Sequence, residues 1–163
     1  MFIGLLSDTH GVFDDELRAF LSPVDEIWHA GDFGGGMATA QEIAGFKPLK
    51  GVCGNCDNYS LRYDHPVERH WECEGMRVMM THIGGSPGHY PEAIVREFRF
   101  YKPDIFICGH SHILKVVRDE EFNLIYINPG AAGYQGWQVF RTALRFHIDK
   151  GELHDMEVLK LQR

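Results

Sequence analysis

The chain has 163 residues, of which 44% are hydrophobic and 24% charged, as is ordinary for a globular protein. This length predicts one domain, residues 1–163, with enough chain to bury a hydrophobic core. The formal net charge of −7 argues against a basic face for nucleic acid, so we expect no stable nucleic-acid binding.

The hydrophobic pattern predicts an α/β chain. Short apolar runs bounded by glycine, proline or polar residues indicate strands, and apolar residues at helical spacing indicate helices. Residues 67–81 are expected to form an antiparallel hairpin that turns at Glu74-Gly75. The predicted strands are 2–6, 26–30, 48–53, 67–73, 77–81, 105–108, 114–118, 124–128, 139–148 and 153–159, and the predicted helices are 14–21, 37–44 and 91–100.

Side chains that can bind a metal follow five of these strands. Taken singly, each is a turn or strand-end residue, but turn chemistry favours Asn, Asp, Ser and Gly rather than four histidines. His110 and His112 are expected to share one side of an extended segment, because alternate residues of a strand point the same way. We therefore predict that seven side chains meet at the carboxyl edge of the sheet: Asp8, His10, Asp32, Asn55, His82, His110 and His112.

The order of these blocks resembles the calcineurin-like metallophosphoesterase family. The family pattern is D-x-H, G-D, G-N-H-[DE], a lone H and G-H-x-H, and the matching blocks span residues 8–112. The later Asn128-Pro129-Gly130 is similar to the small YfcE-like phosphodiesterase branch. The resemblance implies a four-layer α/β/β/α sandwich, with two mixed β-sheets flanked by helices and the ligands on loops at one edge.

The resemblance also implies a centre of two divalent metal ions. Four imidazoles among oxygen ligands suit transition metals better than a pair of Mg²⁺ or Ca²⁺ ions. Manganese is expected first, with iron, zinc or nickel as alternatives. Such ions attract phosphate and generate a hydroxide that attacks phosphorus in line. The implied ligands are Asp8, His10, Asp32 and His112 for one ion and Asp32, Asn55, His82 and His110 for the other, with Asp32 bridging.

Cys56 stands where the family usually has a histidine. A thiol is a weak proton donor, so acid assistance to the leaving group is expected to be reduced. The YfcE-like branch also carries cysteine here, which favours a diesterase over a monoesterase. The implied catalytic residues are Asn55, Cys56 and His82, although Cys56 could simply be a small residue that fits. Asp57 is expected to support the ligands from behind.

The predicted function is hydrolysis of a small phosphodiester by a hydroxide that bridges two metal ions. The alternatives are a protein-interaction scaffold of the same fold with a degraded metal site, as in the retromer subunit, a phosphomonoesterase and a nuclease. Complete ligand blocks argue against the scaffold, and the acidic charge argues against the nuclease. The aromatic stretch 134–137 is a substrate wall, a subunit contact or packed core, and a homo-oligomer is left open.

The cysteines predict a cytoplasmic protein. Cys53, Cys56, Cys73 and Cys108 do not form the pattern of a disulfide framework, which indicates reduced thiols. The C-x-x-C match at 53–56 has no second pair and is interpreted as coincidence. The apolar segment 1–6 is too short for a signal peptide or a membrane span, so we expect no membrane association.

Overall fold

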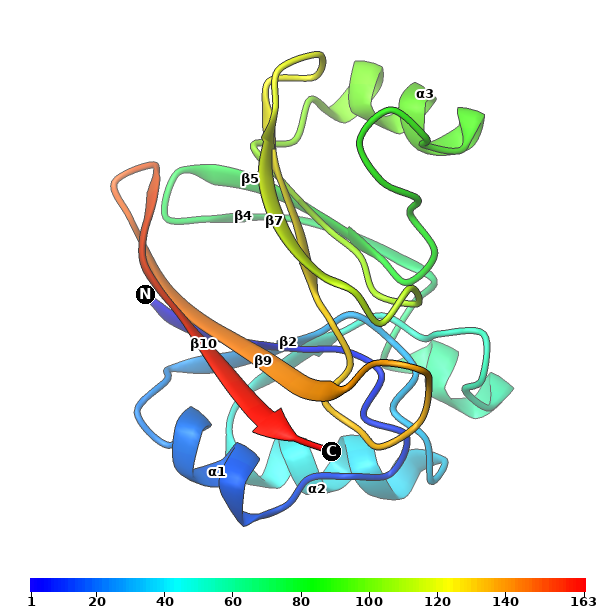
Figure 1. Cartoon of the computed structure of the whole chain (residues 1–163). Coiled ribbons are helices and arrows are strands. Elements are labelled where there is room, and N and C mark those ends of the chain that lie inside the picture. Colours follow the sequence, from blue (N-terminus) through cyan, green and yellow to red (C-terminus); the bar gives the residue numbers. More distant parts are fainter.

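Two five-stranded sheets lie face to face and carry helices on their outer sides (Figure 1). The computed structural model describes all residues, 1–163. One sheet has the order β10-β9-β1-β2-β3 and the other β4-β5-β6-β8-β7. The predicted four-layer α/β/β/α fold is therefore confirmed.

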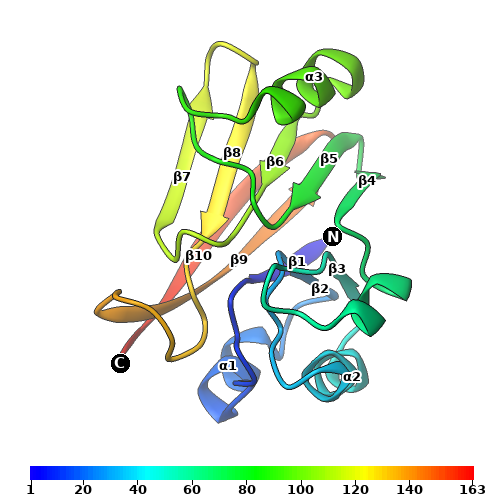
Figure 2. The ribbon, with the colours of Figure 1, turned by 90° about the vertical axis from the view of Figure 1, so that its right-hand side faces the viewer.

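Both sheets are mixed, and their parallel strands end at one edge of the molecule (Figure 2). In the first sheet, β1, β2 and β3 run parallel, and β9 is antiparallel to β1. In the second, β5, β6 and β8 run parallel between the antiparallel strands β4 and β7. The strands are β1 (Phe2–Leu6), β2 (Glu26–His29), β3 (Leu49–Gly51), β4 (Glu68–Cys73), β5 (Met76–Thr81), β6 (Ile105–Ile107), β7 (Leu114–Asp119), β8 (Leu124–Pro129), β9 (Phe140–Asp149) and β10 (Glu152–Gln162).

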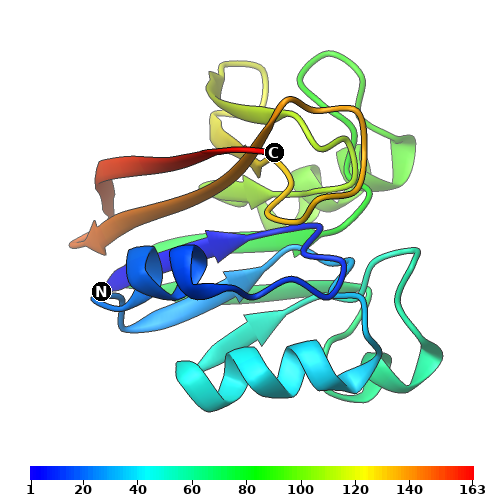
Figure 3. The same cartoon turned by 60° about the horizontal axis from the view of Figure 1, so that its bottom comes forward.

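Three apolar layers separate the four layers of secondary structure. The central layer lies between the sheets and includes Trp28, Ile107 and Phe146, all fully buried. A second packs α1 (Asp15–Leu21) and α2 (Met37–Phe46) on the first sheet (Figure 3). A third packs α3 (Glu92–Tyr101) on the second sheet. Burial of this apolar surface is the main favourable term in folding.

The local sequence explains where the helices begin and end. Asp14 caps α1, since its carboxylate accepts from the N–H of Leu17 at 3.3 Å. Pro91, expected in the first turn of α3, is instead the residue just before it, and the left-handed Lys102 ends this helix. Each helix falls short of the length and hydrophobicity that a membrane-spanning helix needs.

The segment 59–65 differs from the sequence prediction. A 3₁₀-helix, η1 (Tyr59–Tyr63), occupies a stretch for which no element was predicted. His65, two residues after this helix, is buried, and its ring centre lies 4.8 Å from that of Phe33. The sequence around His65 has no hydrophobic period, so its burial depends on the distant Phe33 loop.

Candidate metal centre

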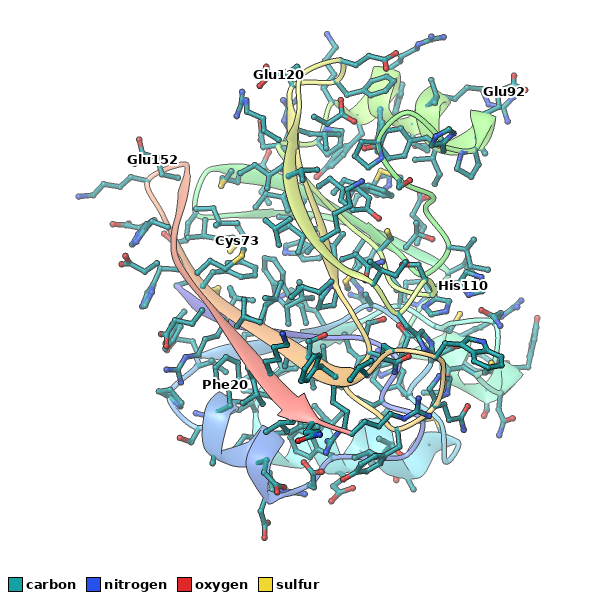
Figure 4. All side chains as sticks on the ribbon, viewed as in Figure 1. Phe20, Cys73, Glu92, His110, Glu120 and Glu152 are labelled. Atoms are coloured by element: carbon teal, nitrogen blue, oxygen red, sulfur yellow. The ribbon has the colours of Figure 1, made fainter.

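The candidate site lies beyond the carboxyl ends of β1, β2, β5 and β6. Figure 4 shows His110 at this edge, on the opposite side of the molecule from Cys73 and Glu152. Parallel strands bring their carboxyl ends to one edge, which is where α/β sheets form sites. The fold thus gathers residues that are far apart in sequence.

Asp8, fully buried, lies at the centre of the site. Its Oδ2 accepts from the hydroxyl of Ser7 at 2.6 Å and from the N–H of His110 at 3.1 Å. Its Oδ1 has no hydrogen-bond partner and lies 3.0 Å from Nε2 of His112. The same oxygen is 4.0 Å from Nε2 of His10 and 3.9 Å from Nε2 of His82. One carboxylate oxygen therefore faces three imidazoles.

The two best-oriented imidazoles each use Nδ1 to hold the ring in place. His82 donates from Nδ1 to the carbonyl of Ala30 at 2.7 Å, because a carbonyl can only accept. His112 Nδ1 lies 3.2 Å from the amide oxygen of Gln138. Each ring thereby turns Nε2 toward the carboxylates, and His82 Nε2 lies 3.3 Å from Asp32 Oδ2. Metal-ligating histidines commonly have this arrangement.

The unpaired atoms of this site fit bound cations. Asp8 Oδ1, His10 Nε2 and His82 Nε2 are buried without hydrogen-bond partners, although buried polar atoms are nearly always paired. All three are nitrogen or oxygen donors of the kind that transition metals take. The potential ligand atoms lie within 4.8 Å of one another in two groups: Asp8, His10 and His112, and Asp8, Asp32 and His82.

The remaining two predicted ligands lie at the rim. His110 is exposed, and its ring centre is 5.3 Å from that of His82. Asn55 is also exposed, and its side-chain amide donates to Cys56 Sγ at 3.4 Å. The two close groups share Asp8, so the bridging role implied for Asp32 stays a prediction.

The backbone of the site is left-handed at five of the seven predicted ligands. The φ angles are 51° at Asp8, 47° at His10, 57° at Asp32, 64° at His110 and 59° at His112. The expectation that His110 and His112 share one side of an extended segment is therefore wrong. A left-handed non-glycine residue costs about 1–2 kcal/mol, so the fold concentrates backbone strain where these side chains converge.

Three motif glycines make room for predicted ligands from other segments. A Cβ on Gly31 would lie 2.6 Å from the ring of His82, and a Cβ on Gly54 would overlap with the Asp32 carboxylate. A Cβ on Gly109 would lie 2.9 Å from Asp8 Oδ2. Real Cβ atoms do not approach so closely. Glycine is thus required at these three positions, because a larger residue would collide with a side chain from another block.

Asp57 supports the ligand loops through their backbone. Its carboxylate accepts from the N–H groups of Asp32 at 2.9 Å, Gly34 at 3.2 Å and Gly54 at 2.8 Å. It contacts no imidazole by hydrogen bond, so its support acts on loop shape rather than on ring orientation. The N–H of Cys56 donates to Asp32 Oδ1 at 2.8 Å. Burial and the neighbouring Asp32 raise the pKa of the Cys56 thiol, which keeps it protonated near neutral pH.

The electrostatics of the site favour positive charge. Burial lowers the pKa of His82, but the Asp32 and Asp8 carboxylates raise it more, so its pKa is above the ordinary value. Burial raises the pKa of Asp32, while the His82 ring and the Cys56 N–H lower it more, so its pKa is well below its usual range. The Asp8 carboxylate raises the pKa of His112 against burial. A proton or a cation is thus stabilised here.

Sequence reasoning missed two residues that contact and orient predicted ligands. Ser7 binds Oδ2 of Asp8, and Gln138 binds Nδ1 of His112. Ser7 directly precedes the first block, so its position next to Asp8 in the sequence could have identified it. Gln138 lies on the β8–β9 loop and has no sequence pattern that links it to residue 112.

The four-layer fold, with candidate metal-binding side chains at one edge of its sheets, is the architecture of a metal-dependent phosphoesterase. The model of the calcineurin-like phosphoesterase superfamily domain matches residues 1–151. The chain belongs to this family. No curated protein matches it.

Solved structures with the same fold cover nearly the whole chain. Vps29 from Entamoeba histolytica complexed with zinc is 15% identical over 99% of both chains, with a TM-score of 0.75. An archaeal phosphodiesterase is 22% identical over 98% of this chain and 100% of its own, with a TM-score of 0.72. A predicted phosphoesterase from Streptococcus pneumoniae is 18% identical over 98% and 97%, with a TM-score of 0.66. At these identities the likeness shows the fold alone.

Proposed function

We propose that this protein hydrolyses small phosphodiesters with two divalent cations. One observation carries the proposal. In a chain of a phosphoesterase family, three buried atoms that can bind a metal face a common centre and have no hydrogen-bond partner: Asp8 Oδ1, His10 Nε2 and His82 Nε2. Cations, when bound, supply positive charge for the phosphate and acidify a water molecule. Manganese is proposed first, with iron, zinc or nickel as alternatives.

The predicted ligands divide into two sets by their place in the fold. Asp8, His10 and His112 would hold one cation, and Asp32 and His82 the other, with His110 and Asn55 at its exposed side. Asp32 is proposed to contact both cations. Asp57 keeps the loops of Asp32, Gly34 and Gly54 in place through its three backbone contacts.

The proposed reaction consumes one water molecule. A bond forms between the water oxygen and phosphorus, the bond to one ester oxygen breaks, and that arm leaves as an alcohol with a proton. Cys56 is proposed to assist the leaving oxygen, since its thiol is exposed at the rim and stays protonated near neutral pH. A thiol is a weak proton donor, so its assistance should be small. Good leaving groups, which need little protonation, should depend on it least.

Two further parts of the proposal concern substrate type and compartment. The fold shared with an archaeal phosphodiesterase supports diesters over monoesters. All four cysteines are free thiols, which supports a reducing compartment such as the cytoplasm.

The second candidate is a protein-interaction scaffold of the same fold. It is supported by the likeness to Vps29, whose fold covers 99% of this chain. The two candidates differ in what the bound cations do, because a scaffold needs no turnover.

The deciding experiment combines metal analysis with an assay. Purified protein is dialysed against manganese, its metal content is measured, and hydrolysis of bis(p-nitrophenyl) phosphate is compared with that of p-nitrophenyl phosphate. We expect two ions per chain and faster hydrolysis of the diester, both lost in Asp32→Asn. Bound metal without hydrolysis of either ester would favour the scaffold, and absence of bound metal would overturn the centre itself.

A further inference from the structure

A pocket of about 530 Å³ adjoins two of the predicted ligands. This volume is within the range of small-molecule sites. No lysine, arginine or carboxylate lines it, so the pocket offers no permanent charge to an ionic group. Its lining residues are His110, Ser111, His112, Ile113, Gly136, Trp137 and Gln138.

Two large apolar side chains of this pocket are exposed to solvent. Trp137 is 102% exposed, and Ile113 is 65% exposed. The other two tryptophans are not available in this way, since Trp28 is fully buried and Trp71 half-buried. An indole left free beside a candidate active site is suited to stacking, because its flat face gains contact area at little cost in conformational entropy.

The loop that carries Trp137 is fixed to the candidate centre on both sides of the indole. A Cβ on Gly136 would overlap with His112 Nδ1, so this glycine packs directly on the ligand ring. Gln138 Oε1 lies 3.2 Å from the same nitrogen, and its amide donates to the carbonyl of Gln135 at 2.6 Å. Arg163 donates to the carbonyls of Gly136 and Gln138. The backbone that carries the indole is therefore held at a fixed position beside His112.

One polar group in the pocket is a free hydrogen-bond donor. The hydroxyl of Ser111 accepts from the amide of Asn128 at 3.0 Å and from the N–H of Ile113 at 3.3 Å. With its oxygen so used, its own proton remains free to donate. A ring nitrogen or carbonyl of a ligand would accept that proton.

We propose that this pocket binds a flat heteroaromatic group of the substrate, stacked on Trp137 while the phosphate lies at His110 and His112. The substrate class is then nucleoside phosphodiesters, with the uncharged base in the pocket. This inference rests on the proposed function. Stacking of a base on an aromatic side chain tolerates different bases, so the pocket selects for the presence of a base rather than its identity.

The first test measures binding without turnover. Adenosine monophosphate and ribose phosphate, which differ only in the base, are titrated into the manganese-loaded protein by isothermal calorimetry. We expect adenosine monophosphate to bind about tenfold more tightly. In Trp137→Leu the two should bind equally, whereas Tyr63→Leu, which removes an aromatic ring 88% exposed elsewhere, should keep the difference. Equal binding to the unaltered protein would overturn the inference.

The second test separates this inference from the proposed function. The methyl diesters of adenosine monophosphate and ribose phosphate are followed by phosphorus NMR. We expect kcat/KM to be about tenfold higher for the adenosine diester and to fall to the ribose value in Trp137→Leu. Hydrolysis of both at the same rate would overturn the base pocket and leave the phosphodiesterase intact. If neither is hydrolysed, the proposed function fails, and the calorimetric comparison still decides whether the pocket takes a base.

Both tests use Trp137→Leu and share one structural control, because a second copy of the chain could cover the exposed indole. Sedimentation of the unaltered protein and of Trp137→Leu gives their oligomeric states. We expect the same state for both. A dimer that dissociates in Trp137→Leu would assign the indole to a subunit contact and overturn the inference.

Discussion

Nε2 of His82 lies 3.3 Å from Oδ2 of Asp32, although Asp32 follows β2 of one sheet and His82 follows β5 of the other. The carbonyl of Ala30, also after β2, fixes the His82 ring at 2.7 Å. The two sheets must therefore pack correctly before these side chains can meet. Cation binding at this point reports on the packing of the whole sandwich.

This relationship predicts that manganese stabilises the fold and that the effect depends on His82. A ligand at about 100 times its Kd adds about 2.7 kcal/mol to the free energy of unfolding. Thermal unfolding with and without manganese should show this gain in the unaltered protein and lose most of it in His82→Ala. His89→Ala, which removes an exposed histidine outside both ligand groups, is the control and should keep the gain. An equal gain in His82→Ala would contradict the ligand assignment.

The glycine packing predicts a large difference between two Gly→Ala substitutions. A Cβ on Gly109 would meet Asp8 Oδ2 at 2.9 Å and overlap with Ser7, so Gly109→Ala should cost about 1–3 kcal/mol and weaken metal binding. Gly45, inside α2, has nothing within 4 Å of its Cβ position, so Gly45→Ala should stabilise by about 0.5–1 kcal/mol. Urea unfolding of both variants measures the difference, and similar stabilities would show that the site backbone yields easily.

Backbone strain at the ligands predicts that glycine is better than alanine at position 110. His110 has φ 64° and is exposed, so both variants lose little packing. His110→Gly relieves the left-handed strain that His110→Ala retains, and should therefore be about 1 kcal/mol more stable. Urea unfolding in a chelating buffer measures this without a metal contribution. If alanine proved the more stable, the φ of this residue would not be strained in solution.

The sequence was sufficient to place the predicted ligands at one edge because each block lies within a few residues of the end of a strand. An apolar run that ends in Asp8 or Asp32 indicates a strand end, and parallel strands share an edge. The antiparallel hairpin at Glu74-Gly75 also formed as the pattern predicted. What these predictions have in common is that they use local hydrophobic runs and general rules of sheet assembly.

Features that depend on distant residues could not be predicted. The left-handed φ of His110 is set by contacts such as its N–H to Asp8, which local propensity does not report. The burial of His65 requires Phe33, and the place of Trp137 requires the fit of Gly136 against His112. These contacts join segments that have no shared pattern in the sequence.

The buried His65 predicts a loss of stability in acid. Burial, and next the Arg69 guanidinium, lower the pKa of His65 below its ordinary value of about 6.5. Below that pH the unfolded chain takes up a proton that the folded chain does not, so the free energy of unfolding falls as pH falls. Unfolding in a chelating buffer at several pH values should show a weaker fall in His65→Phe. An unchanged pH dependence would mean that this ring is not kept neutral by the fold.

The contacts of Asp57 predict that a single change of charge there will damage the site without touching a ligand. Its carboxylate accepts three backbone N–H groups, those of Asp32, Gly34 and Gly54. Asp57→Asn keeps the shape but turns an NH₂ group toward at least one of these donors, and should cost about 1.5–3 kcal/mol. Because the loop of Asp32 loses its support, manganese affinity should fall about 10–100-fold. Calorimetric titration with manganese and urea unfolding measure the two effects.

The exposed Asp64, whose carboxylate accepts no hydrogen bond, gives the matched control Asp64→Asn, which should change neither stability nor manganese affinity. Loss of stability with unchanged metal affinity would show that Asp57 braces the fold but not the centre.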